Sequence, residues 1–161
     1  MSGFFKSCVD RYLELAKKSE SSLRQVASPF LDEACKVVDD EESGELQPIA
    51  ARVLMKVLYG ARMCRYDLLR PTCYLATRIA TWTRGCDRAL NRLMAYISCT
   101  LHLRMLAWVG DVLSKWEYVV YSDADLAGDT QTSRSATGVF TCVRAPTPSR
   151  PCPGHHEGRL V

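Results

Sequence analysis

The chain has 161 residues, 47% of them apolar, so it is long enough for one ordinary hydrophobic core or for two small ones. Its 21 basic and 18 acidic residues leave a net charge of +3, which is too small to require a nucleic-acid partner. No run approaches the roughly 18 apolar residues that a membrane span needs, so we expect no membrane partner.

The first 22 residues have the pattern of a short amphipathic helix. Val9, Tyr12, Leu13 and Ala16 fall three and four residues apart, which places them on one helical face that needs a partner to pack on. Residues 23–47 are acidic, contain Gly44 and lack sustained periodicity. We therefore expect them to form a disordered acidic linker.

Residues 48–100 carry a helical pattern and predict a small helical subdomain. The first predicted helix runs from about Ile49 to Cys64, with Pro48 in its first turn. Asp67 can cap a second helix, which runs through Ile79. A third helix follows Asp87, and it presents one apolar face formed by Leu90, Leu93, Met94 and Ile97.

Residues 101–143 shift towards a period of two and predict strands. Residues 116–121 are aromatic and β-branched, and residues 137–143 are rich in Val, Phe and Thr, so the two segments predict a hairpin. Residues 144–161 contain repeated proline and glycine and predict a disordered tail. The expected fold class is α+β, with a helical subdomain followed by an incomplete sheet.

The eight cysteines contain no close pair of the kind that zinc modules and redox motifs use. Several occupy apolar helix positions, where a reduced thiol behaves as a small hydrophobic side chain. We therefore expect free thiols, no zinc and an intracellular protein rather than a secreted one.

Two segments of the chain are similar to a known signature. Residues 121–129, read as Tyr-Ser-Asp-Ala-Asp-Leu-Ala-Gly-Asp, followed by residues 133–140, resemble the opening of the ribonuclease H domain of copia-type retrotransposons. Upstream segments resemble the helices that this family places between polymerase and nuclease: residues 54–59, 65–69 and 89–97.

The resemblance covers roughly residues 29–143, with the segments in the family's order. One departure is Tyr66, where the family usually has proline between the Arg and the Asp. The resemblance implies the end of a reverse transcriptase, with a thumb- or connection-like helical part, joined to the start of a ribonuclease H-like domain. The parent activities would be RNA-directed DNA synthesis and cleavage of RNA–DNA hybrids.

Ribonuclease H chemistry needs several carboxylates that hold two Mg²⁺ ions. The resemblance implies that Asp123, at the end of the first strand, is the first metal ligand, while Asp125 and Asp129 solvate the turn. In isolation, Asp123 would be interpreted as a turn-capping residue. The family's remaining ligands would follow Val143, where only Glu157 is found, so we expect a vestigial site that binds no Mg²⁺.

A polymerase site needs two adjacent aspartates on a strand hairpin, and Asp39-Asp40 offers such a pair. We interpret the pair as part of a solvated acidic loop, because Glu41 and Glu42 extend the acidic run. In the resembling family, the catalytic pair lies upstream of any segment found here.

Seven basic residues could follow the backbone of an RNA–DNA hybrid through weak, non-specific contacts. An ordinary solvated helix face explains them equally well. They are Arg52, Lys56, Arg62, Arg65, Arg84, Arg88 and Arg92.

The leading hypothesis is a truncated piece of a retrotransposon polyprotein that has no catalysis of its own and no small-molecule substrate. The alternative is a retained nucleic-acid-binding module, whose salt-dependent binding would be lost when Arg88 and Arg92 are changed to Glu. An active nuclease would show Mg²⁺-dependent cleavage abolished by Asp123→Ala. Unpaired strand edges further predict low stability or aggregation.

Overall fold

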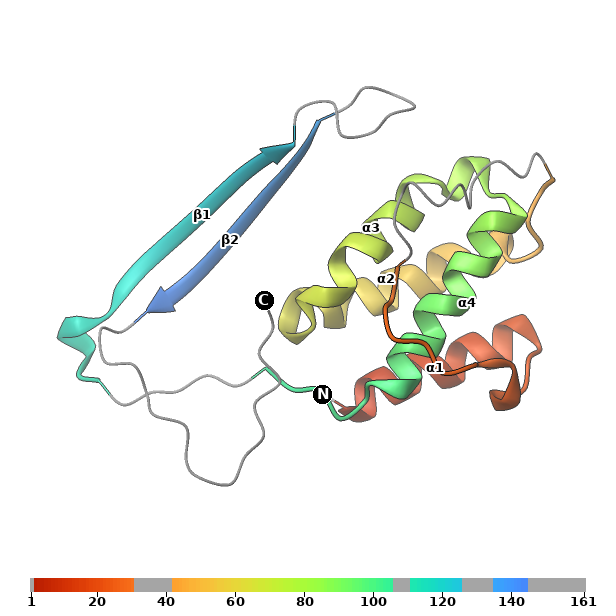
Figure 1. The fold of residues 1–161 in the computed structure, drawn as a ribbon, viewed down its shortest axis with the longest axis horizontal. Coiled ribbons are helices and arrows are strands. Elements are labelled where there is room, and N and C mark those ends of the chain that lie inside the picture. Colours follow the sequence, from red (N-terminus) through yellow and green to blue (C-terminus); the bar gives the residue numbers. More distant parts are fainter. Residues whose placement is uncertain (1, 31–41, 106–110, 126–134, 145–161) are drawn as a thin grey trace. The chain divides into compact units, whose positions relative to one another are not determined.

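The computed structural model describes residues 2–30, 42–105, 111–125 and 135–144 (Figure 1). The described residues divide into two units, one within residues 1–105 and one within residues 106–161. The first unit contains α1 (Ser2–Ala16), α2 (Gln47–Cys64), α3 (Leu69–Thr77) and α4 (Arg84–Cys99). The second contains β1 (Glu117–Asp125) and β2 (Ala136–Arg144). The predicted α+β class is confirmed, since the first unit is helical and the second contains a two-stranded sheet.

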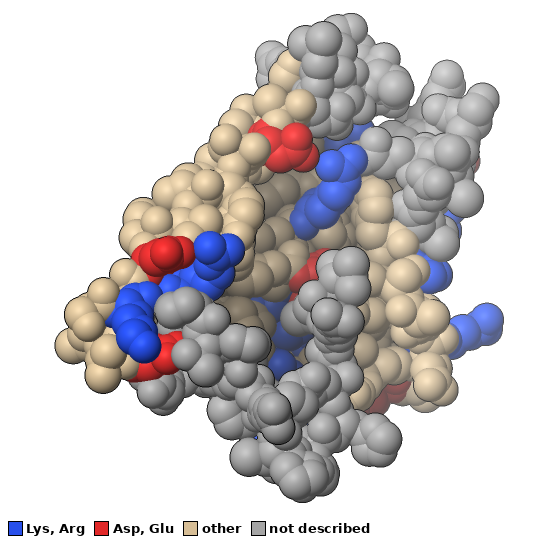
Figure 2. Space-filling view, turned by 60° about the vertical axis from the view of Figure 1, so that its left-hand side comes forward, with Lys and Arg blue, Asp and Glu red and all other residues tan. Residues whose placement is uncertain are grey.

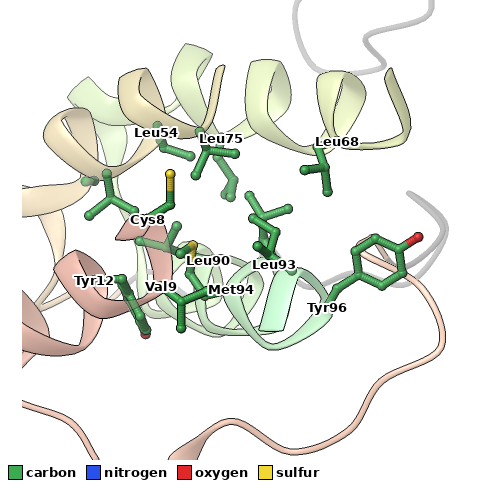
Figure 3. Packing of buried hydrophobic residues seen from close by; sticks show 14 of the residues in the cluster. Cys8, Val9, Tyr12, Leu54, Leu68, Leu75, Leu90, Leu93, Met94 and Tyr96 are labelled. Atoms are coloured by element: carbon green, nitrogen blue, oxygen red, sulfur yellow. The ribbon is translucent and has the colours of Figure 1, made fainter. Parts of the chain in front are cut away.

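The helical unit has one hydrophobic core, to which α1, α2, α3 and α4 all contribute (Figure 3). α2 and α4 bury the apolar faces that the sequence predicts, because residues three and four apart share one side of a helix. Burial of each large aliphatic side chain stabilises the unit by about 1.5–3 kcal/mol. The central side chains are Val53, Leu54, Val57, Leu68, Leu75, Leu90, Leu93, Met94 and Ile97.

α1 belongs to this core and packs against both α2 and α4. Its buried residues include Val9 and Tyr12, two of the four that the sequence analysis placed on one face. The Tyr12 hydroxyl donates a hydrogen bond to Asn91 Oδ1 of α4 at 2.9 Å. The partner that the amphipathic pattern required is therefore the rest of the helical unit.

Gly60 allows α1 and α2 to approach closely. A Cβ atom at this position would lie 2.7 Å from Phe4 Cε1 and 2.8 Å from Phe5 Cζ. Phe5 is buried in the core, so its ring has no open space into which it can move. The absence of a side chain at residue 60 is therefore a packing requirement.

We expect Gly60→Ala to lower the free energy of unfolding by about 1–2 kcal/mol, because overpacking outweighs the gain in helix propensity. Gly3→Ala is the matched control, since a Cβ atom at Gly3 would meet no atom within 4 Å. The control should stabilise α1 by up to about 1 kcal/mol. Urea denaturation followed by circular dichroism measures both, and a stabilising Gly60→Ala would contradict the packing argument.

The end of the acidic linker pairs with the start of α4. Ser43 and Thr83 form an isolated antiparallel bridge, and the Gly44 N–H donates to the Trp82 carbonyl at 3.1 Å. A Cβ atom at Gly44 would meet the Thr83 carbonyl oxygen at 2.5 Å. The expectation of a disordered linker is therefore wrong for residues 42–46, and also for residues 23–30, where Leu23 and Val26 pack against the core. Residues 31–41 lie outside the described residues.

Two helix starts differ from the predictions. α4 begins at Arg84 rather than after Asp87, and Thr83 is its N-cap, with Oγ1 accepting a hydrogen bond from the Cys86 N–H at 3.4 Å. α3 begins at Leu69 without a side-chain cap, because the Asp67 carboxylate binds Arg65 instead. The Asp87 carboxylate has backbone partners 42 and 41 residues away, at Glu45 and Leu46, whereas the partner of Asp67 is its near neighbour Arg65.

β1 and β2 form an antiparallel hairpin, in which Glu117 pairs with Arg144 and Asp125 pairs with Ala136. β1 extends to Asp125, beyond the predicted end at residue 121, so Asp123 lies inside a strand. Residues 101–105 form no strand despite their alternation. Residues 126–134 and 145–161 lie outside the described residues, whereas Arg144, placed in the predicted tail, is the last residue of β2.

Within the described ranges, no helix is long and apolar enough to cross a membrane.

Candidate nucleic-acid interface

The exposed side of α2 carries two of the predicted basic residues, Arg52 and Arg62. Arg52 and Arg62 are exposed and stand ten residues apart, which corresponds to about 15 Å along the helix. Met55, Tyr59 and Met63 recur every four residues on the same side and are also exposed. We name these five residues the α2 face. It combines two guanidinium groups with one aromatic and two flexible apolar side chains.

Lys56 connects α2 with α1 rather than facing solvent. Its ammonium group donates to the Ser7 carbonyl at 3.0 Å and lies 5.9 Å from the centre of the Phe4 ring. The side chain is half-buried. Lys56 is therefore a helix-packing residue, and its charge is less accessible to a phosphate than the charges of Arg52 and Arg62.

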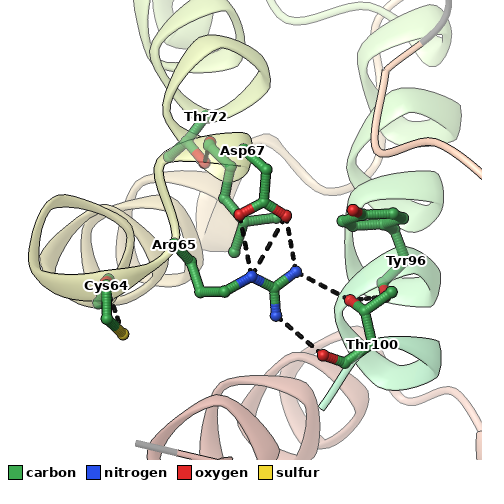
Figure 4. Close-up of polar contacts among 8 residues, drawn as sticks. Cys64, Arg65, Asp67, Thr72, Tyr96 and Thr100 are labelled. Atoms are coloured by element: carbon green, nitrogen blue, oxygen red, sulfur yellow. Dashed lines mark hydrogen bonds and ion pairs between the residues drawn. The ribbon is translucent and has the colours of Figure 1, made fainter. Parts of the chain in front are cut away.

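Arg65 is buried, and its guanidinium group is fully engaged (Figure 4). Nε and Nη2 donate to the Asp67 carboxylate, with a closest distance of 2.7 Å. Nη1 and Nη2 also donate to the carbonyl and hydroxyl oxygens of Thr100 at the end of α4. The expectation that Arg65 contacts nucleic acid is corrected here, because its charge is paired inside the protein and shielded from solvent.

Tyr96 borders this buried ion pair, and Arg65 lies 5.7 Å from the centre of its ring. Burial raises the pKa of the Tyr96 hydroxyl, and the neighbouring Asp67 carboxylate raises it further. Burial also raises the pKa of the Cys8 thiol to about 11, and it raises the pKa of Tyr12. All three groups are therefore neutral at pH 7, which suits structural roles better than proton transfer.

The three basic residues of α4 differ in their surroundings. Arg84 is exposed and forms an ion pair with Glu42 at 2.6 Å. Arg88 is exposed. Arg92 is half-buried, and it donates to the carbonyl and hydroxyl oxygens of Ser28 at 3.1 Å. Arg92→Glu would therefore break a structural contact, so the pair Arg88 and Arg92 does not test nucleic-acid binding cleanly.

On the face drawn in Figure 2, the basic side chains of the described residues stand in small groups, several of them next to acidic side chains. Such an arrangement generates a weaker field than a continuous basic patch would. Any contact with nucleic acid through this surface would be weak and sensitive to salt.

Asp123 is exposed in β1 and lies opposite Gly138 of β2, so its cross-strand neighbour supplies no second carboxylate. Among the described residues there is no group of three or more His, Cys, Asp or Glu side chains that could hold a metal ion. Asp129, Glu157 and the pair Asp39-Asp40 lie outside the described residues.

Two features of the helical unit were not found from the sequence. Asp87 accepts hydrogen bonds from the backbone N–H groups of Glu45 and Leu46 and from the Trp82 indole, and no local spacing indicates these partners. The apolar part of the α2 face, unlike the partners of Asp87, could have been predicted from the sequence. Its three members repeat every four residues on the side opposite the predicted buried face.

Comparisons with known protein families, with curated proteins and with solved structures found no match. The likeness to copia-type elements therefore rests on the residues quoted above.

Proposed function

We propose that this chain corresponds to the end of a copia-type reverse transcriptase joined to the start of its ribonuclease H domain, and that it has no catalysis of its own. The order of the chain supports this, since helices precede a hairpin that carries the signature residues. The observation that supports the second part is that Asp123, the one predicted ligand whose side chain is described, belongs to no group of three or more His, Cys, Asp or Glu side chains among the described residues.

A nuclease assay tests the absence of catalysis. The full chain is incubated with a labelled RNA–DNA hybrid and Mg²⁺, beside an Asp123→Ala variant. We expect equal, background cleavage from both proteins, because one carboxylate cannot hold the two metal ions of this chemistry. Mg²⁺-dependent cleavage that disappears in Asp123→Ala would overturn the proposal.

A second candidate function, non-specific binding of an RNA–DNA hybrid, is favoured by the α2 face. Guanidinium groups bind phosphate oxygens through paired donors and keep their charge at all physiological pH values. An exposed aromatic ring such as Tyr59 adds a surface on which a base can stack. The interleaving of these two kinds of side chain on one helix supports binding to a nucleic-acid backbone without sequence specificity.

Changing Arg52 and Arg62 together to Glu should weaken binding of a fluorescent RNA–DNA hybrid by about tenfold or more at low salt. It should also reduce the slope of log affinity against log salt by about two, one for each lost phosphate contact. Fluorescence anisotropy over a salt titration measures both quantities.

The matched control changes Arg24 and Arg104 to Glu, because both are exposed, lie outside α2 and produce the same change in net charge. The control pair should bind nearly as the unmodified chain does. Equal weakening by the two pairs would assign binding to overall charge rather than to the α2 face. No binding at low salt would remove this candidate function.

A further inference from the structure

The hairpin leaves apolar side chains exposed on both of its faces. Tyr118, Val120, Val139 and Val143 share one face and are between 55% and 72% exposed. The other face carries Tyr121 and Phe140, whose stacked rings lie 6.2 Å apart. A two-stranded sheet is marginally stable in water unless further strands or a packing partner complete it. The composition of the hairpin therefore indicates that it is part of a larger sheet.

The two strands differ in the charges along their edges. β1 begins with Glu117 and has Asp123 and Asp125 at its end, whereas β2 has no charged residue before Arg144, its last. Neither strand contains Lys or Pro, the residues that usually block edge-to-edge pairing. Residues 137–143 combine β-branched and aromatic side chains with no charge, which favours pairing between identical strands. β2 is thus the edge suited to receive another strand.

Repulsion between like charges disfavours pairing of two copies through the β1 edge and leaves the β2 edge. An antiparallel pairing of β1 with β1 of a second copy, centred at Val120, would place Glu117 opposite Asp123 twice, and like charges in these positions are destabilising. The corresponding pairing of β2 with β2, centred at Phe140, places Arg144 opposite the uncharged Ala136. This pairing has two-fold symmetry and therefore closes at two copies instead of extending into a fibre.

We propose that β2 pairs antiparallel with β2 of a second copy of this chain, so that two hairpins form one four-stranded sheet. Opposite residues in an antiparallel pair point to the same side of the sheet. Pairing centred at Phe140 therefore aligns the Tyr121 and Phe140 rings of both copies in one row across four strands. The inference concerns the hairpin alone and is independent of nucleic-acid binding by the α2 face.

Two lysine substitutions on one cross-strand pair test the edge. Thr141 and Val120 are opposite each other, exposed and on the same face, but they belong to different strands. In the proposed dimer, Thr141→Lys places one lysine of each copy next to the junction of the two β2 strands. Val120→Lys places the two lysines one strand further from that junction. We expect sedimentation equilibrium of the full chain to show twice the 18.1 kDa of one copy. Dimerisation of Thr141→Lys should be about tenfold weaker, and that of Val120→Lys nearly unchanged.

Three outcomes would overturn the proposal. Equal weakening by Thr141→Lys and Val120→Lys would place the contact on the sheet face rather than on the β2 edge. A monomer at every concentration would show that no second copy binds. Amide hydrogen exchange of the unmodified chain gives a measurement that needs no variant. The proposal predicts that protection of the β2 amides rises with protein concentration, while protection of the β1 amides changes less. Protection of β2 that is independent of concentration would show that another segment of the same chain covers this edge.

Discussion

Replacing Asp67 with alanine is expected to lower the free energy of unfolding of the helical unit by about 3–5 kcal/mol, because it leaves the Arg65 charge buried without its partner. The Arg65 side chain is 3% exposed and the Asp67 side chain 13% exposed, with a closest contact of 2.7 Å. Two charges in such a place attract each other strongly, since little water screens them. Urea denaturation followed by circular dichroism measures the loss.

The ion pair between Arg84 and Glu42 is the matched control. Its contact distance is 2.6 Å, but the two side chains are 56% and 67% exposed. Glu42→Ala should therefore cost only about 0–1 kcal/mol, as is usual for ion pairs in water. Equal losses for Asp67→Ala and Glu42→Ala would show that burial of the Arg65 pair is not what makes it important.

A double variant separates the ion pair from the packing around it. Arg65→Met combined with Asp67→Leu removes both charges and fills a similar volume with apolar atoms. We expect this variant to recover most of the stability lost in Asp67→Ala, because no uncompensated charge remains buried. Failure to recover would mean that the hydrogen bonds from Arg65 to Thr100 hold α4 against α2 by themselves.

The second large effect is expected for Asp87→Ala, which should destabilise the helical unit by about 2–4 kcal/mol. The Asp87 carboxylate accepts from the N–H groups of Glu45 at 2.8 Å and Leu46 at 3.1 Å, and from the Trp82 indole at 2.6 Å. Trp82 is buried, so its N–H would lose its partner in a place that water reaches poorly. The same change removes the carboxylate that joins α4 to the start of α2.

Asp87→Asn retains one carbonyl oxygen in nearly the same place and should lose less than half as much stability as Asp87→Ala. Hydrogen exchange of the Glu45 and Leu46 amides provides a local readout, because both should exchange faster in Asp87→Ala. Unchanged exchange at these two amides would show that other groups fix the start of α2.

The apolar faces of α2 and α4 could be predicted from the sequence, and the reason is local. A helix repeats every 3.6 residues, so the spacing of Val53, Leu54 and Val57 already determines which side is apolar. The hairpin was also predictable, since β-branched and aromatic residues cluster in two short runs. The starts of these elements were less accurate, because Asp67 binds Arg65 instead of capping α3, and because α4 begins before Asp87, with Thr83 as its N-cap.

The roles of the basic residues could not be predicted in the same way. Arg65 binds Thr100, which is 35 residues away, and Arg92 binds Ser28, which is 64 residues away. A local pattern assigns Arg52, Arg65 and Arg92 equally to an accessible basic surface. Only the fold separates a guanidinium that can meet a phosphate from one that stabilises the interior.

The sequence by itself determined the α+β class, the apolar helix faces and the hairpin, because each depends on residues close together in the chain. The tertiary structure decided that α1 completes the core, that Arg65 is internal and that Asp123 faces a glycine. These depend on which distant segments meet, and on the large difference in energy between a charge in water and the same charge in a protein interior.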